Sequence, residues 1–246
     1  MLQVCLNGAR ERTSHAHLPL LPDELARAAR AAVVAGAQDI HLHPKDHAGL
    51  DTLEADAVAA AVTAVRAAAP GIPVGVTTGA WATPDPQDRA IQVRSWTVLP
   101  DHASVNWHED GAGDVAAALL SRGVGIEAGI YSATRAAGRF LGWPHSHRVL
   151  RVLAEVTETD PQTATRAAAD LLESLSSVTS PILLHGEDAA AWPVLRIAAT
   201  RGLDTRIGLE DVLHLPDGSD APGNAELVRA AHEIMRRVPH AEATPE

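Results

Sequence analysis

The sequence is poor in several residue types that define protein classes. It contains one cysteine, Cys5, and one lysine, Lys45, among 246 residues, and aromatic residues make up 3%. A single cysteine excludes a disulfide within the chain and is typical of a reducing compartment. No run approaches the roughly 18 apolar residues that a membrane-spanning helix needs, and the N-terminus lacks the pattern of a secretory signal. We therefore expect a cytoplasmic protein.

Positive charge is also scarce. The formal net charge of -11 argues against non-specific nucleic-acid binding, which requires a basic face. An acidic protein still accommodates small acidic substrates, because a local basic site can lie inside an acidic surface. The chain has no linker-like stretch, so we expect a single domain over residues 1–246, with a flexible tail from about residue 239.

Short apolar runs alternate with alanine-rich helical patterns along the whole chain. Strands are expected at 2–6, 39–43, 72–77, 103–107, 124–130, 149–156, 181–184 and 204–209. Helices are expected near 22–35, 53–69, 86–97, 111–121, 132–141, 160–176, 187–201 and 222–237. This alternation predicts a parallel sheet, and its count and length match a (β/α)₈ TIM barrel. A doubly wound sheet is the main alternative, but no GxGxxG motif follows the first strand.

Polar residues gather where the predicted strands end, which is where barrels of this kind place their active sites. His41 and His43 are two positions apart and therefore share one face of their strand. The second and eighth strands both neighbour the first in a closed barrel, so Glu210 can meet this pair. Two histidines and a carboxylate suit a divalent metal, zinc before iron or manganese. His15 and His17 repeat the spacing in a polar loop, which shows that the pair alone is a weak signal.

One stretch carries a more specific pattern. Residues 206–211 read RIGLED, and the string GSDAPGNAELV follows at 218–228. Together with NGARE at 7–11, AGAQDIHLHPKDHAG at 35–49 and VTTGA at 76–80, this sequence resembles the β-keto acid cleavage enzymes. The resemblance implies a (β/α)₈ barrel with zinc held by His41, His43 and Glu210. It also implies an acyltransferase reaction in which a β-keto acid and acetyl-CoA give acetoacetate and a new acyl-CoA.

The same resemblance implies roles for further residues. Asp211 corresponds to the family's general base, Arg206 to its arginine, and Glu127 to a glutamate of the fifth strand. Thr77, Thr78 and Gly79 correspond to the turn that holds the substrate carboxylate, and Glu11 corresponds to the residue that reads the far end of the substrate. Asn106 departs from the family and indicates a substrate pocket particular to this chain. A small-molecule β-keto acid, acetyl-CoA and a homo-oligomer are the implied partners.

Some features depart from the family or have plainer explanations. The chain is short for the family, and Pro44-Lys45 stands where arginine is common, so coenzyme A binding is the least supported implication. Two alternatives stay open: a metal-dependent aldolase, lyase or epimerase that forms an enolate without coenzyme A, and a non-catalytic metal-binding relative. We interpret Lys45 as a solvated loop residue and Asn224 as part of a helix N-terminal turn. Five histidines are assigned to the surface or rim: His102, His108, His145, His147 and His185.

Overall fold

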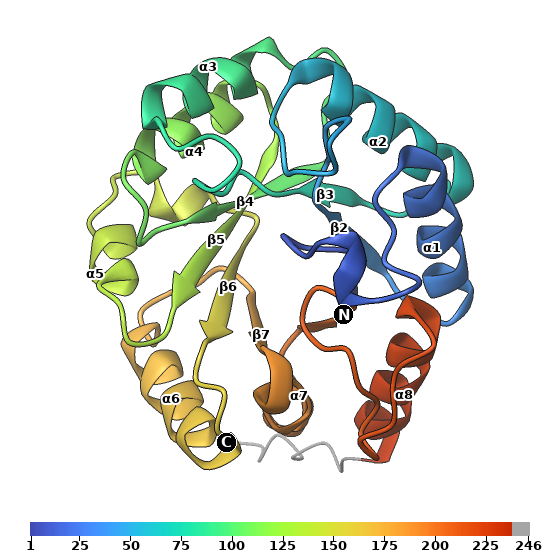
Figure 1. Ribbon diagram of the computed structural model, residues 1–246. Coiled ribbons are helices and arrows are strands. Elements are labelled where there is room, and N and C mark those ends of the chain that lie inside the picture. The colour runs from blue at the N-terminus through green and yellow to red at the C-terminus, as the bar shows by residue number, and fades with distance from the viewer. Residues whose placement is uncertain (238–246) are drawn as a thin grey trace.

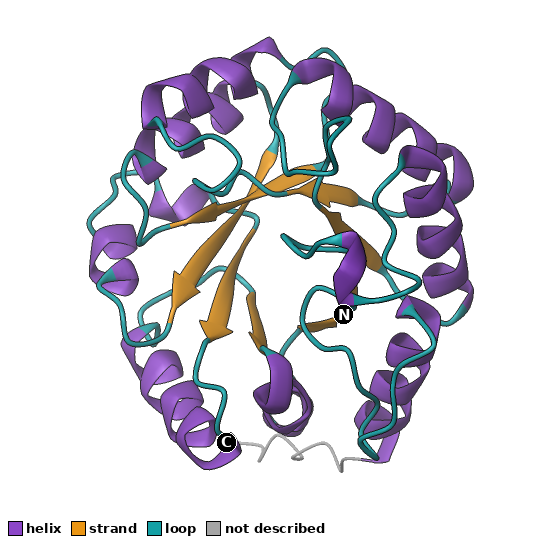
Figure 2. Cartoon of the chain, viewed as in Figure 1, coloured by secondary structure: helices purple, strands orange, loops and turns teal. Residues whose placement is uncertain are grey.

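The computed structural model describes residues 1–237, and over this range eight parallel strands form a ring that eight helices surround (Figures 1 and 2). The strands are β1 (Leu2–Cys5), β2 (Asp39–Leu42), β3 (Val74–Val76), β4 (His102–Asn106), β5 (Gly125–Tyr131), β6 (Arg151–Val156), β7 (Ile182–Gly186) and β8 (Thr205–Ile207). The helices are α1 (Pro22–Val34), α2 (Ala55–Ala68), α3 (Pro86–Ser95), α4 (Ala112–Ser121), α5 (Ala136–Leu141), α6 (Pro161–Ser174), α7 (Ala191–Thr200) and α8 (Asn224–Arg237). The predicted single-domain (β/α)₈ barrel is confirmed, while the tail predicted from about residue 239 lies outside the described residues.

The sheet closes on itself between its two ends, β7 and β8. The strand order is β7-β6-β5-β4-β3-β2-β1-β8, so β2 and β8 flank β1 as expected. The remaining seam between β7 and β8 is joined by a parallel bridge from Leu183 to Asp204 and by a 2.9 Å bond from the Leu184 amide to the Asp204 carbonyl. Closure brings residues that are about 170 positions apart in the sequence, in β2 and after β8, to the same rim.

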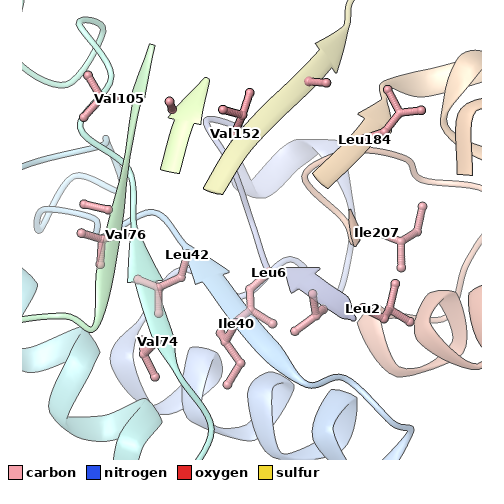
Figure 3. Packing of buried hydrophobic residues seen from close by; sticks show 14 of the residues in the cluster. Leu2, Leu6, Ile40, Leu42, Val74, Val76, Val105, Val152, Leu184 and Ile207 are labelled. Carbon is pink, nitrogen blue, oxygen red and sulfur yellow. The ribbon is translucent and has the colours of Figure 1, made fainter. Parts of the chain in front are cut away.

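Strand alternation divides the side chains into an outer apolar set and an inner polar set. Leu2, Ile40, Val74 and their counterparts on other strands pack against the surrounding helices in one buried apolar cluster (Figure 3). The residues between them turn inward. Gln3 of β1 shows this directly, because its amide donates to Glu127 of β5 at 2.8 Å, across the barrel. The interior of the ring is therefore polar, and apolar burial takes place mainly outside it.

Helix starts follow the sequence signals. Asp85 and Asp160 accept hydrogen bonds from the first turns of α3 and α6, and each is followed by proline at the first helical position. The predicted helix 132–141 is shorter than expected and begins at Ala136, because Ala133 adopts a positive φ of 55° that helices exclude. Among the described residues, no helix has the length and apolar character to span a membrane.

Candidate metal centre and active site

The structure brings the three predicted metal ligands together. His41 lies in β2, His43 directly follows it, and Glu210 comes three residues after β8. The Glu210 carboxylate lies 3.8 Å from His41 Nε2 and 3.6 Å from His43 Nε2. One donor atom from each residue falls within 4.8 Å of the other two. The set offers two imidazole nitrogens and a carboxylate oxygen, a combination typical of zinc sites that keep an open position.

Each histidine has a carboxylate behind it. His43 Nδ1 lies 2.7 Å from Asp51 Oδ2, and His41 Nδ1 lies 3.8 Å from Glu127 Oε2. A hydrogen bond such as that from His43 to Asp51 fixes the orientation of a metal-binding imidazole and raises its basicity. His41 Nδ1 has no hydrogen-bond partner among the described residues, so Glu127 acts on it through charge alone. Burial lowers the pKa of His41 to about 4, which keeps the imidazole neutral. Burial also lowers the pKa of His43, but the negative charges of Glu210 and Asp51 outweigh this effect and raise that pKa to about 9. A metal cation bound at Nε2 would take the place of the proton there.

Glu210 itself indicates that the group fits a metal. Its Oε2 is buried and has no hydrogen-bond partner among the described residues. A buried carboxylate oxygen without a partner is costly unless something else satisfies it. Gly8, with φ of 58°, leaves the space that Glu210 needs, since a Cβ there would lie 2.5 Å from its Cγ. The three donors therefore suit a divalent cation.

A second group of acidic and histidine side chains, deeper in the barrel, has a different character. Asp39, His102 and Glu127 lie close together, but Arg151 bonds both carboxylates at 2.6 Å. The guanidinium thus supplies the positive charge in this group. Burial lowers the pKa of His102, yet the two carboxylates raise it to about 10, so the imidazole is a second cation there. This group forms an inner ionic network and is the poorer metal site.

Arg206 and Asp211 lie next to the three candidate metal ligands, as the sequence predicted. Arg206 donates to Asp211 Oδ1 from Nε at 3.1 Å and from Nη2 at 2.9 Å, and Nη2 also reaches Glu210 Oε1 at 3.0 Å. Asp211 Oδ2 is buried and has no partner within residues 1–237. Burial raises the pKa of Asp211 to about 6 against the opposing effect of Arg206. This carboxylate combines a fixed orientation with one free oxygen, as a general base requires.

The predicted carboxylate-binding turn already has internal partners. Thr78 donates its hydroxyl to the Ser104 carbonyl at 2.6 Å, and Thr77 Oγ1 accepts from the Gly79 amide at 3.1 Å. The carboxylate of Glu109 accepts from the Ala80 amide at 3.0 Å, and it also accepts from Asn106 Nδ2 at 2.9 Å. Glu109, which the sequence did not single out, therefore lies where the substrate carboxylate was expected.

A comparison of the sequence with protein-family models agrees with the geometry of this site. A model of the beta-keto acid cleavage enzyme family matches residues 1–115 and 130–246. The chain belongs to this family.

Several solved structures resemble this chain in fold. The binary complex of ObcA with oxaloacetate has a TM-score of 0.69 and 19% identity, over 88% of this chain and 63% of the ObcA chain. The apo structure of ObcA has a TM-score of 0.67 and 19% identity, over 88% of this chain and 61% of the ObcA chain. A 3-dehydroquinate dehydratase from Geobacillus kaustophilus HTA426 has a TM-score of 0.59 and 11% identity, over 96% of this chain and 89% of the dehydratase chain. The chain thus spans about three fifths of the length of ObcA.

The position after the histidine pair, where this family member carries lysine, is buried. The Lys45 side chain is 2% exposed, pairs with Asp51 and donates to the Gly8 carbonyl at 2.8 Å. Our interpretation of Lys45 as a solvated loop residue is wrong, because Asp51 offers it a buried counter-charge. Glu11 is exposed on the rim and lines a hollow of about 490 Å³ together with Lys45, Asp51 and Trp81. Trp81 stacks on the His43 ring at 5.8 Å, so this hollow adjoins the metal centre.

Two histidines assigned to the surface or rim are interior residues. His102 and His185 are each 1% exposed. His185 ends up inside because β7 continues to Gly186, two residues beyond the predicted strand. Alternation within β4 and β7 places both side chains on the inner face, a signal that the sequence already contained. Asn224 begins α8, as predicted, and its side chain also joins the Leu209 amide to the Leu6 carbonyl, at 2.9 Å each.

Proposed function

We propose that this protein cleaves a β-keto acid in a metal-dependent reaction with acetyl-CoA, giving acetoacetate and a new acyl-CoA. The observation that carries the proposal is the free, buried Oδ2 of Asp211 beside the three-residue centre of His41, His43 and Glu210. Family membership supports the reaction class. The acyl acceptor and the transferase class come from the resemblance of the sequence to the family.

In this proposal His41, His43 and Glu210 hold one zinc ion. When bound, the zinc would act as a Lewis acid that lowers the cost of negative charge on the keto oxygen. Asp211 takes a proton from the carbon next to that keto group, and Arg206 keeps the base in place through Oδ1. General bases of this kind contribute about two to four orders of magnitude in rate. Glu127 lies 3.8 Å from His41 Nδ1 without a hydrogen bond, so its effect on the site is that of a nearby charge.

The substrate contacts belong to the proposal as well. Glu11 faces the hollow beside Trp81, where it can meet the far end of a β-keto acid. The turn after β3 consists of Thr77, Thr78 and Gly79, and Asn106 ends β4. Because Glu109 occupies that turn, a substrate carboxylate bound there has to displace or share its donors. A small keto acid suits the comparison with ObcA, whose complex is with oxaloacetate, itself a β-keto acid. A cytoplasmic location and a homo-oligomer stay predictions.

A second function keeps the metal and the enolate but omits coenzyme A. The engagement of Lys45 with Asp51 and the Gly8 carbonyl favours it, because the one lysine of the chain is then not available to a phosphate of coenzyme A. The chain also spans only 63% of the length of ObcA. In this case the protein would be a divalent-metal lyase or aldolase acting on the same kind of acid.

The experiment is a screen of the zinc-loaded protein against β-keto acids, with and without acetyl-CoA, in which acetoacetate and acyl-CoA products are measured by mass spectrometry. His41→Ala should lose both zinc and turnover. The exposed His17, from the second H-x-H pair, provides the matched control, and His17→Ala should retain both. Turnover at the same rate with and without acetyl-CoA would favour the second function. Bound zinc with no turnover of any keto acid would overturn both.

A further inference from the structure

Three inward-facing side chains of neighbouring strands form a line that leads to Asp211. Arg206 of β8 donates from Nε to His185 Nδ1 of β7 at 3.2 Å. His185 Nε2 lies 3.4 Å from Oε2 of Glu155 in β6. All three residues are at least nine-tenths buried, with exposures of 5%, 1% and 3%. The same Arg206 Nε also donates to Asp211, so one N–H holds the histidine and the carboxylate together.

The direction of these bonds determines which His185 nitrogen carries the proton. An arginine N–H can only donate, so His185 Nδ1 has to accept and carries no hydrogen. A neutral imidazole then has its hydrogen on Nε2, which points at the Glu155 carboxyl. Burial and Arg206 both lower the pKa of His185, to about 3, in agreement with a neutral ring. The geometry thus specifies one tautomer.

The Glu155 carboxyl lies 3.4 Å from His185 Nε2, a contact that falls short of hydrogen-bond geometry and leaves that nitrogen without a hydrogen-bond partner among the described residues. The Glu155 side chain has no hydrogen bond to residues 1–237 either, and burial raises its pKa to about 7. Space for it comes from Gly129 of β5, where a Cβ would lie 2.6 Å from Glu155 Oε1. A strand glycine at this point has a defined purpose, because any side chain would displace the carboxyl.

We propose that His185 and Glu155 are positioning residues that orient Arg206, and through it the base Asp211, by a fixed His185 tautomer. The inference rests on the proposed role of Asp211 as base. Arg206 Nε divides its hydrogen between His185 and Asp211. When the histidine acceptor is lost, the guanidinium can rotate away from the two-bond contact with Asp211 Oδ1. The free Oδ2 then loses its fixed direction, whereas no hydrogen bond joins Arg206 to His41 or His43 within the described residues.

The line is not a proton relay. Passing a proton along it would require His185 Nδ1 to carry a hydrogen toward Arg206, which would set two donors against each other. The two residues therefore contribute orientation, and their loss should lower kcat more than it raises KM for the β-keto acid.

Two variants of the same position separate positioning from simple packing. His185→Asn retains a carbonyl acceptor for Arg206 Nε, whereas His185→Leu has a similar volume and no acceptor. We expect the leucine variant to lose about two orders of magnitude or more in kcat, toward the full contribution of a general base. The asparagine variant should recover most of this loss, and zinc content should be unchanged in both. Equal losses in the two variants, in parallel with their Tm, would overturn the proposal in favour of a packing role.

A second measurement does not need turnover. Nitrogen-15 NMR of the zinc-loaded protein, with labelled histidine and His185→Asn for assignment, reports which ring nitrogen is protonated. We expect an Nε2–H tautomer at pH 7 that does not titrate down to about pH 4. An Nδ1–H tautomer or a titration near pH 6.5 would overturn the proposal. If the wild type showed this tautomer but cleaved no β-keto acid, the proposed function would fail while the orientation of Arg206 would stand.

Discussion

Replacement of Asp51 by asparagine tests whether carboxylates behind the histidines define the metal centre. Asp51 accepts from three donors: His43 Nδ1 at 2.7 Å, Trp81 Nε1 at 2.6 Å, and Lys45. An amide of the same shape has only one acceptor oxygen and no charge. Either His43 or Lys45 must then face an NH₂ group, and the imidazole loses the negative charge that orients it.

The expected size follows from these contacts. Loss of a carboxylate partner of a metal-binding histidine typically weakens metal affinity by about 10- to 100-fold. This factor equals about 1.4–2.8 kcal/mol, which agrees with the roughly 1.5–3 kcal/mol of a hydrogen bond to a charged group. Lys45, whose side chain is 2% exposed, also loses its counter-charge, so stability should fall as well.

Zinc affinity is measured by competition with a chelator of known strength, and stability by the thermal midpoint of the metal-free protein. Asp46→Asn is the matched control, because Asp46 lies in the same loop and accepts only from the backbone amides of Ala48 and Leu50 within the described chain. An asparagine can accept those bonds equally well. If Asp51→Asn bound zinc within twofold of the wild type, the argument for a supporting carboxylate would be refuted.

Three further changes test the inner network, the close approach of strands, and the buried histidine. Arg151→Met should lower the free energy of unfolding by about 3–5 kcal/mol, because it removes the guanidinium that bonds two buried carboxylates and leaves only the His102 imidazole beside them. Urea unfolding measures this, with the exposed Arg166→Met as control. Gly208→Ala should prevent folding, since a Cβ would lie 1.8 Å from a main-chain oxygen of β1, whereas Gly138→Ala in α5 meets nothing within 4 Å and should raise Tm. The pKa of His102 is raised from 6.5 to about 10 in the fold, so its stabilisation is complete below pH 6.5 and should decline as the pH rises toward 10. A flat profile of unfolding free energy over this range would contradict it. His102→Gln should reduce the slope and leave the part that His43 contributes.

The meeting of the three proposed metal ligands could be predicted because two local rules suffice for it. Strand alternation puts His41 and His43 on one face, and barrel closure puts β2 and β8 on either side of β1. Neither rule depends on side-chain detail. Asp51 and Glu109 could not be predicted in the same way, since both lie in loops whose paths are set by contacts with Lys45, Trp81 and Ala80.

The sequence alone determined the barrel, the sides of its strands and the meeting of two histidines with Glu210, because these follow from periodicity and from the order of strands. Only the tertiary structure decided the inner polar network, the burial of Lys45 and the contact between Arg206 and His185. These pairings depend on atoms that meet across the ring, as Gln3 and Glu127 do at a separation of 124 residues. A hydrogen bond needs distances correct to a few tenths of an ångström, and the packing of the whole barrel sets distances at that scale.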